Sequence, residues 1–287
     1  MAVYRGTTGM TDHCYSVLLP VYGKDSPAYL RIAIDSMLAQ TLPPEEILIA
    51  VDGPIGNDLM SVIDQYRTAQ PEVFSLCQSP ERAGLGALLR KAVPLCRNAY
   101  IARMDADDYS SPERLAKQFA VLDQRSDVDI VGCNVDEFTD DVTSPVSHVV
   151  LPESPEDAAQ FAKRRCPMRH PALLYRKDDV LTAGNYAPLY TFEDYDLIVR
   201  MLHRGLRLYN IQEPLVSMRI SPDFYMRRGG PRFVFCMIRT KWNFLAMGFS
   251  SPLDFLVSCL GQIFVGLMPG SFRAWFYRTF LRKETAV

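Results

Sequence analysis

The chain has 287 residues, long enough for one large core or two modest ones, and its 48% hydrophobic and 22% charged residues are ordinary for a globular protein. The formal net charge of -2 is unevenly distributed. Residues 219–287 carry ten Lys or Arg and three Asp or Glu (about +7), and the rest of the chain carries 21 Lys or Arg and 30 Asp or Glu (about -9). This asymmetry indicates a C-terminal region that docks on an anionic surface, either a membrane or nucleic acid. The seven cysteines form no C-x-x-C pair, which argues against a zinc cluster or a disulfide framework, and no run reaches the roughly 18 apolar residues of a membrane-spanning helix.

The N-terminal segment, MAVYRGTTGMTDHCYS, lacks the continuous apolar core of a secretory signal, so we expect a protein that stays inside the cell without crossing a bilayer. After it, short apolar runs alternate with segments of helical periodicity. Repeated strand–helix–strand units of this kind are typical of a doubly wound α/β domain with a mostly parallel sheet. The predicted strands are Val17–Tyr22, Glu46–Val51, Val73–Cys77 and Ala99–Ala102, and the predicted helices are Pro27–Leu38, Asn57–Ala69 and Gly84–Cys96, which Pro94 shortens.

Ligands of open parallel sheets bind beyond the carboxyl ends of the strands. A tyrosine there can cover a base, an aspartate can accept from a base or ribose donor, and a metal with an arginine can hold a diphosphate. No Walker loop and no G-x-G-x-x-G motif occurs, so phosphate binding must fall to metal and arginine. The predicted strand ends carry Pro20-Val21-Tyr22, Asp52-Gly53-Pro54, Arg82-Ala83-Gly84 and the acidic run Asp105–Asp108.

The acidic run follows a short apolar segment and precedes a predicted helix start at 110–113. Asp105 and Asp107 lie two residues apart, and a turn leaving the strand can bring both carboxylates to one divalent cation, which offsets their mutual repulsion. The alternative is a solvated turn that caps the next helix. Within the run we expect Asp105 and Asp107 to face the metal and Asp108 to mark the entry to the helix.

The second half of the chain is less regular. Asp129–Cys133 and Ala172–Tyr175 are predicted strands, Thr139–Pro155 is a linker rich in turn residues, and Phe192–Arg204 is a predicted amphipathic helix. Its start, Glu193-Asp194-Tyr195-Asp196, places three carboxylates ahead of the apolar positions. Acidic residues in a first helical turn interact favourably with the helix dipole, which is the structural alternative to a catalytic role.

Four motifs in this order resemble those of the inverting, nucleotide-sugar-dependent glycosyltransferases of family 2, which have the GT-A fold. The segments are YSVLLPVYGKD, ILIAVDGP, RMDADD and FEDYDLIVRML, and the resemblance runs from about Tyr15 to Gly230. It implies a catalytic domain at residues 12–220 that requires Mn²⁺ or Mg²⁺. Residues 221–287 then form a basic, amphipathic, helical C-terminal region.

The resemblance also implies roles for individual residues. Asp52 would bind the nucleobase with Pro20 and Tyr22 beside it, and Asp105 and Asp107 would serve the diphosphate and the metal. Asp194 would be the general base, since inversion needs one carboxylate opposite the leaving group to take the proton of the acceptor hydroxyl.

Four further residues are weaker candidates. Arg82 and Arg103 are candidates for phosphate contact; the alternatives are that Arg82 lies on the surface and that Arg103 pairs with a neighbouring aspartate. Glu193 and His170 are placed on the acceptor side by the resemblance. The alternative for His170 is a structural histidine that fixes its loop.

Two departures from the family pattern restrict these implications. Only Asp52 follows the second strand where many members have two carboxylates, and the Q-x-x-R-W motif of processive members is absent, which favours one sugar per acceptor. In its place Ser221–Gly230, SPDFYMRRGG, resembles a subgroup that adds single sugars to lipid-linked repeats of bacterial surface polysaccharides.

The segment SFRAWFYRTFLRK near the C-terminus interleaves cations with aromatic residues. This pattern suits a helix in a membrane interface, and the alternative is a helical cap packed on the catalytic core. We expect a cytoplasmic protein, peripheral on the inner face of the bacterial inner membrane, where a polyprenyl-diphosphate-linked acceptor would lie.

The expected reaction is transfer of one hexose, galactose or glucose, from a UDP-sugar to a lipid-diphosphate-linked GlcNAc or GalNAc saccharide in a β linkage, during O-antigen or capsule assembly. The near alternative is a rhamnosyl or other deoxysugar transferase that uses a dTDP-sugar. A nucleotidylyltransferase is disfavoured, because Tyr22-Gly23-Lys24-Asp25 is no glycine-rich lysine loop. A nucleic-acid-binding protein acting through the basic tail leaves the acidic motifs unexplained, so we expect no nucleic-acid partner.

Overall fold

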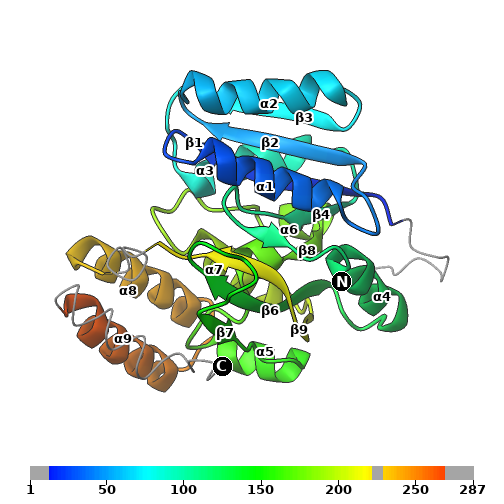
Figure 1. Cartoon of the computed structure of the whole chain (residues 1–287). Helices are drawn as coiled ribbons and strands as arrows, with labels where there is room; N and C mark the ends of the chain where they lie inside the picture. Colours follow the sequence, from blue (N-terminus) through cyan, green and yellow to red (C-terminus); the bar gives the residue numbers. More distant parts are fainter. Residues whose placement is uncertain (1–12, 222–228, 269–287) are drawn as a thin grey trace.

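The computed structural model describes residues 13–221 and 229–268 (Figure 1). Within them, nine strands form one sheet in the order β3-β2-β1-β4-β8-β6-β9-β5, with β7 paired to β6. The strands are β1 (Tyr15–Tyr22), β2 (Glu46–Asp52), β3 (Phe74–Ser79), β4 (Tyr100–Arg103), β5 (Tyr109–Ser110), β6 (Ile130–Phe138), β7 (Ser147–Val149), β8 (Leu174–Arg176) and β9 (Leu208–Arg219). The helices are α1 (Pro27–Leu38), α2 (Asn57–Ala69), α3 (Leu85–Ala92), α4 (Arg114–Gln124), α5 (Pro155–Ala162), α6 (Lys177–Thr182), α7 (Glu193–His203), α8 (Pro231–Ala246) and α9 (Pro252–Leu267).

The N-terminal half is a parallel sheet with a helical layer on each face. β3, β2, β1 and β4 run parallel, and every residue of β2 is buried, as expected for a strand covered on both sides. Alternate residues of β1 enter opposite cores: Val17 and Leu19 pack with α1 and α2, and Leu18 packs with α3 and α7. The doubly wound arrangement predicted for this half is confirmed.

The second half makes the sheet mixed. β8 is antiparallel to β4 and to β6, and β9 runs parallel to β6. β9 was not among the predicted strands, and β7 lies inside the segment predicted as a turn-rich linker. The register between β6 and β9 shifts around Asn134, which lies opposite Pro214, so the two-residue alternation that identifies a strand is interrupted there.

The helix predicted to start at residues 110–113 begins later. Tyr109 and Ser110 pair with β9 as β5, and the helix α4 begins at Arg114. The N–H of Ser110 donates to the side-chain oxygen of Ser36 at 3.2 Å, so this segment is held to α1 and to the sheet. At residues 109–110, hydrogen bonds to β9 and to Ser36 take the place of the hydrogen bonds of the predicted helix. The shortening of α3 at Pro94 is confirmed, since the helix ends at Ala92 and a 3₁₀ turn follows.

Two helices, α8 and α9, follow the sheet and pack side by side, with α9 outermost (Figure 1). Phe244 of α8 packs in one buried cluster with Tyr195 and Val199 of α7. Within the described residues, no helix is both long enough and apolar enough to span a bilayer. The predicted interfacial segment after residue 268 and most of the SPDFYMRRGG segment, residues 222–228, lie outside the described residues.

Candidate active site

The carboxyl ends of β1 and β2 meet at one edge of the sheet. Tyr22 lies opposite Asp52 in the parallel register, and the guanidinium carbon of Arg82 lies 5.3 Å from the centre of the Tyr22 ring. Pro20 lies inside β1, buried and opposite Ala50. The predicted nucleotide-binding residues Tyr22, Asp52 and Arg82 are therefore close together, and Pro20 lies two residues earlier in β1.

Asp52 holds the loop that follows β3. Its carboxylate oxygens accept from the backbone N–H groups of Ala83 at 2.7 Å and Gly84 at 3.1 Å. The next residue, Gly53, has φ of +79°, and a Cβ on it would lie 2.8 Å from the nitrogen of Arg82, so glycine is required there. Asp52 is buried, and the base contact expected for it stays a prediction beside this observed structural role.

The acidic run begins with a buried ion pair. Arg103 is fully buried at the end of β4, and its guanidinium donates to Asp105 at 2.5 Å. The structure thus contains the aspartate pairing that was the alternative to a phosphate contact for Arg103. Asp105 is 32% exposed, so it links the buried arginine to the surface of the site.

Sequence reasoning missed one carboxylate of this edge, Asp25, which interacts with Asp105 and Asp107. The pKa of Asp25 is raised to about 7 by burial and by the charges of Asp107 and Asp105, although its bond from the N–H of Tyr22 at 2.8 Å acts the other way. The pKa of Asp107 is raised to about 6 by burial and by Asp105. The segment Tyr22-Gly23-Lys24-Asp25 places an acid after the first strand, but only the tertiary structure brings it to the acidic run.

Asp108 does not mark a helix entry, which corrects the prediction for this residue. It is 2% exposed, and it accepts from the backbone N–H of Arg219 in β9 at 2.8 Å. Arg219 also donates through Nε to the carbonyl of Asp107 at 3.2 Å. Burial and the two neighbouring aspartates raise the pKa of Asp108 well above its usual range. The run is therefore tied to β9, the strand that the sequence pattern did not reveal.

The start of α7 lies within electrostatic range of this edge. Burial raises the pKa of Glu193 to about 7, with Asp194 and, more weakly, Asp105 acting in the same direction. Asp194 is partly exposed, and its Oδ1 accepts from the N–H of Tyr195 at 2.7 Å. A Cβ on Gly86 at the start of α3 would lie 3.0 Å from the Cβ of Glu193, so the two helix starts are in tight contact. Glu193 at the start of α7 therefore interacts electrostatically with Asp105 of the acidic run.

His170 is held inside the protein. It is 8% exposed, and its Nε2 lies 2.8 Å from the hydroxyl of Tyr186, which is also 3.1 Å from the hydroxyl of Tyr175. Burial and the nearby Arg103 charge lower the pKa of His170 well below its usual value. These contacts match the structural alternative for His170, and its acceptor contact stays a prediction.

The donor set fits a divalent cation shared with a ligand. Within residues 13–221 and 229–268, no group of three or more His, Cys, Asp or Glu side chains is arranged to hold a metal ion. Mg²⁺ commonly takes one or two carboxylates and completes its shell with substrate phosphates and water. Asp105 and Asp107 offer that number of carboxylates, and their mutual repulsion is what a cation relieves.

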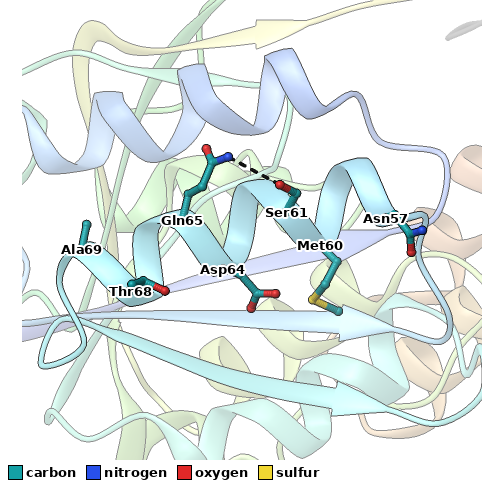
Figure 2. A pocket seen from close by; sticks show the side chains of 7 residues that line it. All are labelled: Asn57, Met60, Ser61, Asp64, Gln65, Thr68 and Ala69. Atoms are coloured by element: carbon teal, nitrogen blue, oxygen red, sulfur yellow. Dashed lines mark hydrogen bonds between the residues drawn. The ribbon is translucent and has the colours of Figure 1, made fainter.

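A surface hollow of about 650 Å³ lies along α2, and none of the predicted site residues lines it (Figure 2). All of its lining residues belong to that one helix, and its one carboxylate, Asp64, is 3.3 Å from Arg67. The hollow therefore lacks converging polar groups of the kind that a specific ligand site needs.

The sequence and the fold of this chain are similar to those of known proteins. The model of the family described as Glycosyl transferase family 2 matches residues 16–181. The chain is 32% identical over 272 residues to the UDP-Gal:α-D-GlcNAc-diphosphoundecaprenol β-1,3-galactosyltransferase of Escherichia coli, covering 94% of this chain and 97% of that protein. It is 30% identical over 209 residues to an O-antigen biosynthesis glycosyltransferase of Escherichia coli, covering 71% of this chain and 79% of that protein.

A solved structure with a similar fold is the mannosyltransferase from Pyrobaculum calidifontis in complex with GDP-Man and Mn²⁺. Its TM-score is 0.63 at 13% sequence identity, and the match covers 90% of this chain and 71% of that chain. At this identity the likeness concerns the fold alone, and it confirms the predicted GT-A architecture.

Proposed function

Because this chain belongs to glycosyl transferase family 2, we propose that it is an inverting glycosyltransferase that transfers one hexose from a UDP-sugar to a lipid-diphosphate-linked GlcNAc or GalNAc saccharide. The hexose is galactose or glucose in a β linkage, and the reaction belongs to surface-polysaccharide assembly. The observation that carries the proposal is that Glu193, at the start of α7, interacts electrostatically with Asp105 of the acidic run and lies against the start of α3. The Escherichia coli galactosyltransferase named for such a donor and acceptor supports the choice of substrates.

The donor half of the site recognises a nucleoside diphosphate. Tyr22 and Arg82 offer a ring and a cation beside the loop that Asp52 fixes, and this suits a base and the adjoining phosphates. Asp105 and Asp107 would hold Mn²⁺ or Mg²⁺, which when bound stabilises the charge that develops on the leaving diphosphate. The buried guanidinium of Arg103 fixes the orientation of the Asp105 carboxylate through their hydrogen bond.

The acceptor half removes a proton. As the acceptor hydroxyl oxygen bonds to the anomeric carbon, the bond from that carbon to the diphosphate oxygen breaks and its electron pair leaves with UDP. The hydroxyl proton passes to the carboxylate of Asp194, and the configuration inverts because attack and departure occur on opposite faces. Glu193, buried beside Asp194, is proposed to contact the acceptor together with His170.

The proposal includes location and domain organisation. We assign residues 12–220 to the catalytic domain and residues 221–287 to a C-terminal region that docks on an anionic membrane, at the inner face of the bacterial inner membrane. The support is the charge asymmetry of the sequence and the lipid-linked acceptor named for the Escherichia coli relative. Nucleic acid has no part in this function.

A donor and acceptor screen tests the proposal. The full chain is incubated with UDP-galactose, UDP-glucose, UDP-GlcNAc and dTDP-rhamnose and with GlcNAc- or GalNAc-diphosphate-lipid analogues, with Mn²⁺, Mg²⁺ or chelator. We expect transfer of one hexose from a UDP-sugar that chelator abolishes and Mn²⁺ restores. Metal-independent transfer from dTDP-rhamnose, without hexose transfer, would overturn the proposal in favour of a deoxysugar transferase.

A further inference from the structure

Helix α9 presents a row of large apolar side chains to solvent. The row runs the length of the helix with spacings of one, three and four residues, which places its members on one face. Each side chain in the row is at least 45% exposed. The members are Leu253, Leu256, Val257, Leu260, Phe264 and Leu267.

No exposed charge interrupts this row. The single charged residue of α9 is Asp254, which is buried, caps the helix with Ser251 and pairs with Arg164 at 2.7 Å. Scattered exposed leucines are normal on a protein surface, but a contiguous apolar face without charge marks a site of interaction. α9 therefore turns its polar group inward and its apolar side chains outward.

Helix α8, which packs beside α9, exposes two further large apolar side chains, Trp242 and Phe235. Trp242 is 58% exposed, and its ring contacts that of Phe255 of α9 in an edge-to-face arrangement at 5.9 Å. Phe235, one heptad before Trp242, is also exposed. Arg232 and Arg239 are the exposed cations of α8. We call the α9 row together with Phe235 and Trp242 the apolar face.

We propose that the apolar face lies in the headgroup and upper acyl region of an anionic bilayer. This inference rests on the proposed function and deepens it, because it names folded helices, rather than the basic tail alone, as the membrane contact. Leucine and aromatic side chains enter that region, while cations at its border meet anionic lipid.

Charge favours a bilayer over a second protein as the occupant. Arg232 and Arg239 lie on the same exposed side of α8 as Phe235 and Trp242, and the guanidinium of Arg232 stacks on the Tyr190 ring at 3.9 Å. The sequence after α9 carries four cations, Arg273, Arg278, Arg282 and Lys283, against one acid, Glu284. A protein interface normally surrounds its apolar core with a mixed polar rim, whereas the exposed charged side chains of α8 and α9 are two cations, which suits anionic lipid.

The fold connects this face to the proposed base. The Nζ of Lys241 in α8 donates to the hydroxyl of Tyr195 at 2.5 Å, and Phe244 packs on the same ring at 5.0 Å. Tyr195 follows Asp194 in α7. A bilayer contact at α9 thus orients the site with respect to the surface in which a lipid-linked acceptor is embedded.

Vesicle co-sedimentation of the full chain tests the inference without donor or acceptor, so its outcome is independent of the proposed reaction. The variant Val257→Glu/Leu260→Glu places charge in the apolar face. The matched control, Leu95→Glu/Val150→Glu, changes the same residue types at exposed positions elsewhere. We expect the face variant to bind phosphatidylglycerol-containing vesicles at least tenfold more weakly than the parent, and the control to bind within twofold of it.

Unchanged vesicle binding by a folded Val257→Glu/Leu260→Glu variant would overturn the inference. A parent protein that is a dimer, with a variant that is a monomer and still binds vesicles, would also overturn it and assign the apolar face to a protein interface. A second measurement covers a variant that fails to fold. Trp275→Phe leaves Trp242 as the one tryptophan. In anionic vesicles the fluorescence of Trp242 should shift to the blue and be quenched by brominated lipid. An unchanged Trp242 spectrum in vesicles that bind the protein would assign the membrane contact to the basic segment after α9 and overturn the inference.

Discussion

At the scale of single residues, the aspartates of the site divide into buried ones and partly exposed ones. Asp52 and Asp108 are engaged with backbone N–H groups, so their first effect is to hold loops together. Asp105, Asp107 and Asp194 remain at least partly exposed at the same edge. The exposed acids are therefore the ones on which chemistry is expected to depend.

Replacing the proposed base separates chemistry from binding. Asp194→Asn keeps the size of the side chain but cannot take a proton, so we expect kcat to fall by about 10²- to 10⁴-fold. Binding of UDP, measured by calorimetry, should stay within twofold of the parent value.

Asp196→Asn is the matched control on the same helix, since Asp196 pairs with Arg200 at 2.8 Å and not with the site. It should lower stability more than turnover. Turnover of Asp194→Asn within a few-fold of the parent would place the base elsewhere.

A second substitution tests the cation. Asp107→Ala removes one of the two carboxylates, so Mn²⁺ should strengthen UDP binding less in the variant than in the parent, by about tenfold or more in Kd. Asp64→Ala in the α2 hollow serves as the control and should leave the metal effect unchanged. Equal metal effects in parent and Asp107→Ala would remove Asp107 from the site.

At the scale of elements, the contact between α7 and α8 contains a buried lysine. Lys241 is 3% exposed and lies 4.4 Å from the centre of the Tyr195 ring. Burial lowers the pKa of Lys241 from its ordinary value of 10.5 to about 7. Burial therefore disfavours the charged form of Lys241, and we expect the stability of the folded protein to depend on pH through this residue.

The direction of that dependence follows from proton counts. Between pH 7 and 10 the unfolded chain keeps a proton on Lys241 that the folded chain has released, so the free energy of unfolding rises with pH. One proton gives a slope of at most about 1.4 kcal/mol per pH unit. Denaturant unfolding at pH 7, 8 and 9 should show this rise in the parent and a flatter profile in Lys241→Met. The control variant Lys91→Met changes an exposed lysine and should show the same rise as the parent. Parallel profiles for the parent and Lys241→Met would contradict the lowered pKa of Lys241.

At the scale of the whole molecule, a mixed sheet with a helical layer on each face carries the candidate site at the carboxyl ends of β1, β2 and β4. Helices α8 and α9 pack beside this sheet domain. α8 shares a buried cluster with α7 and α5 through Phe244, Tyr195 and Ala162. Arg164 beside α5 pairs with Asp254 of α9. The C-terminal helices are thus joined to the catalytic half by packing and by charge.

This packing predicts one cooperative unfolding transition. Far-ultraviolet and near-ultraviolet circular dichroism and calorimetry should give coincident midpoints, because α8 cannot separate without exposing the α7 cluster. Phe244→Ala should lower the free energy of unfolding by about 3 to 5 kcal/mol. Two resolved transitions, one assigned to residues 221–287, would show that the regions fold independently.

Local pattern was enough to predict the alternation of strands and helices up to α3, because buried parallel strands are short apolar runs and helices keep a 3.6-residue period. It also located the acidic run at a strand end and the Glu193-Asp194 pair at a helix start. It missed β9, since Pro214 and a register shift interrupt the alternation there.

The sequence by itself determined the fold class, the family motifs and the residues that carry the proposed chemistry, since these depend on neighbours along the chain. The tertiary structure decided that Asp25 joins the acidic run, that Asp108 is bonded to β9, that Lys241 is buried against Tyr195 and that α9 turns its apolar row outward. The physical reason is that burial, charge crowding and hydrogen bonding between distant segments depend on which surfaces meet, and local periodicity does not specify that.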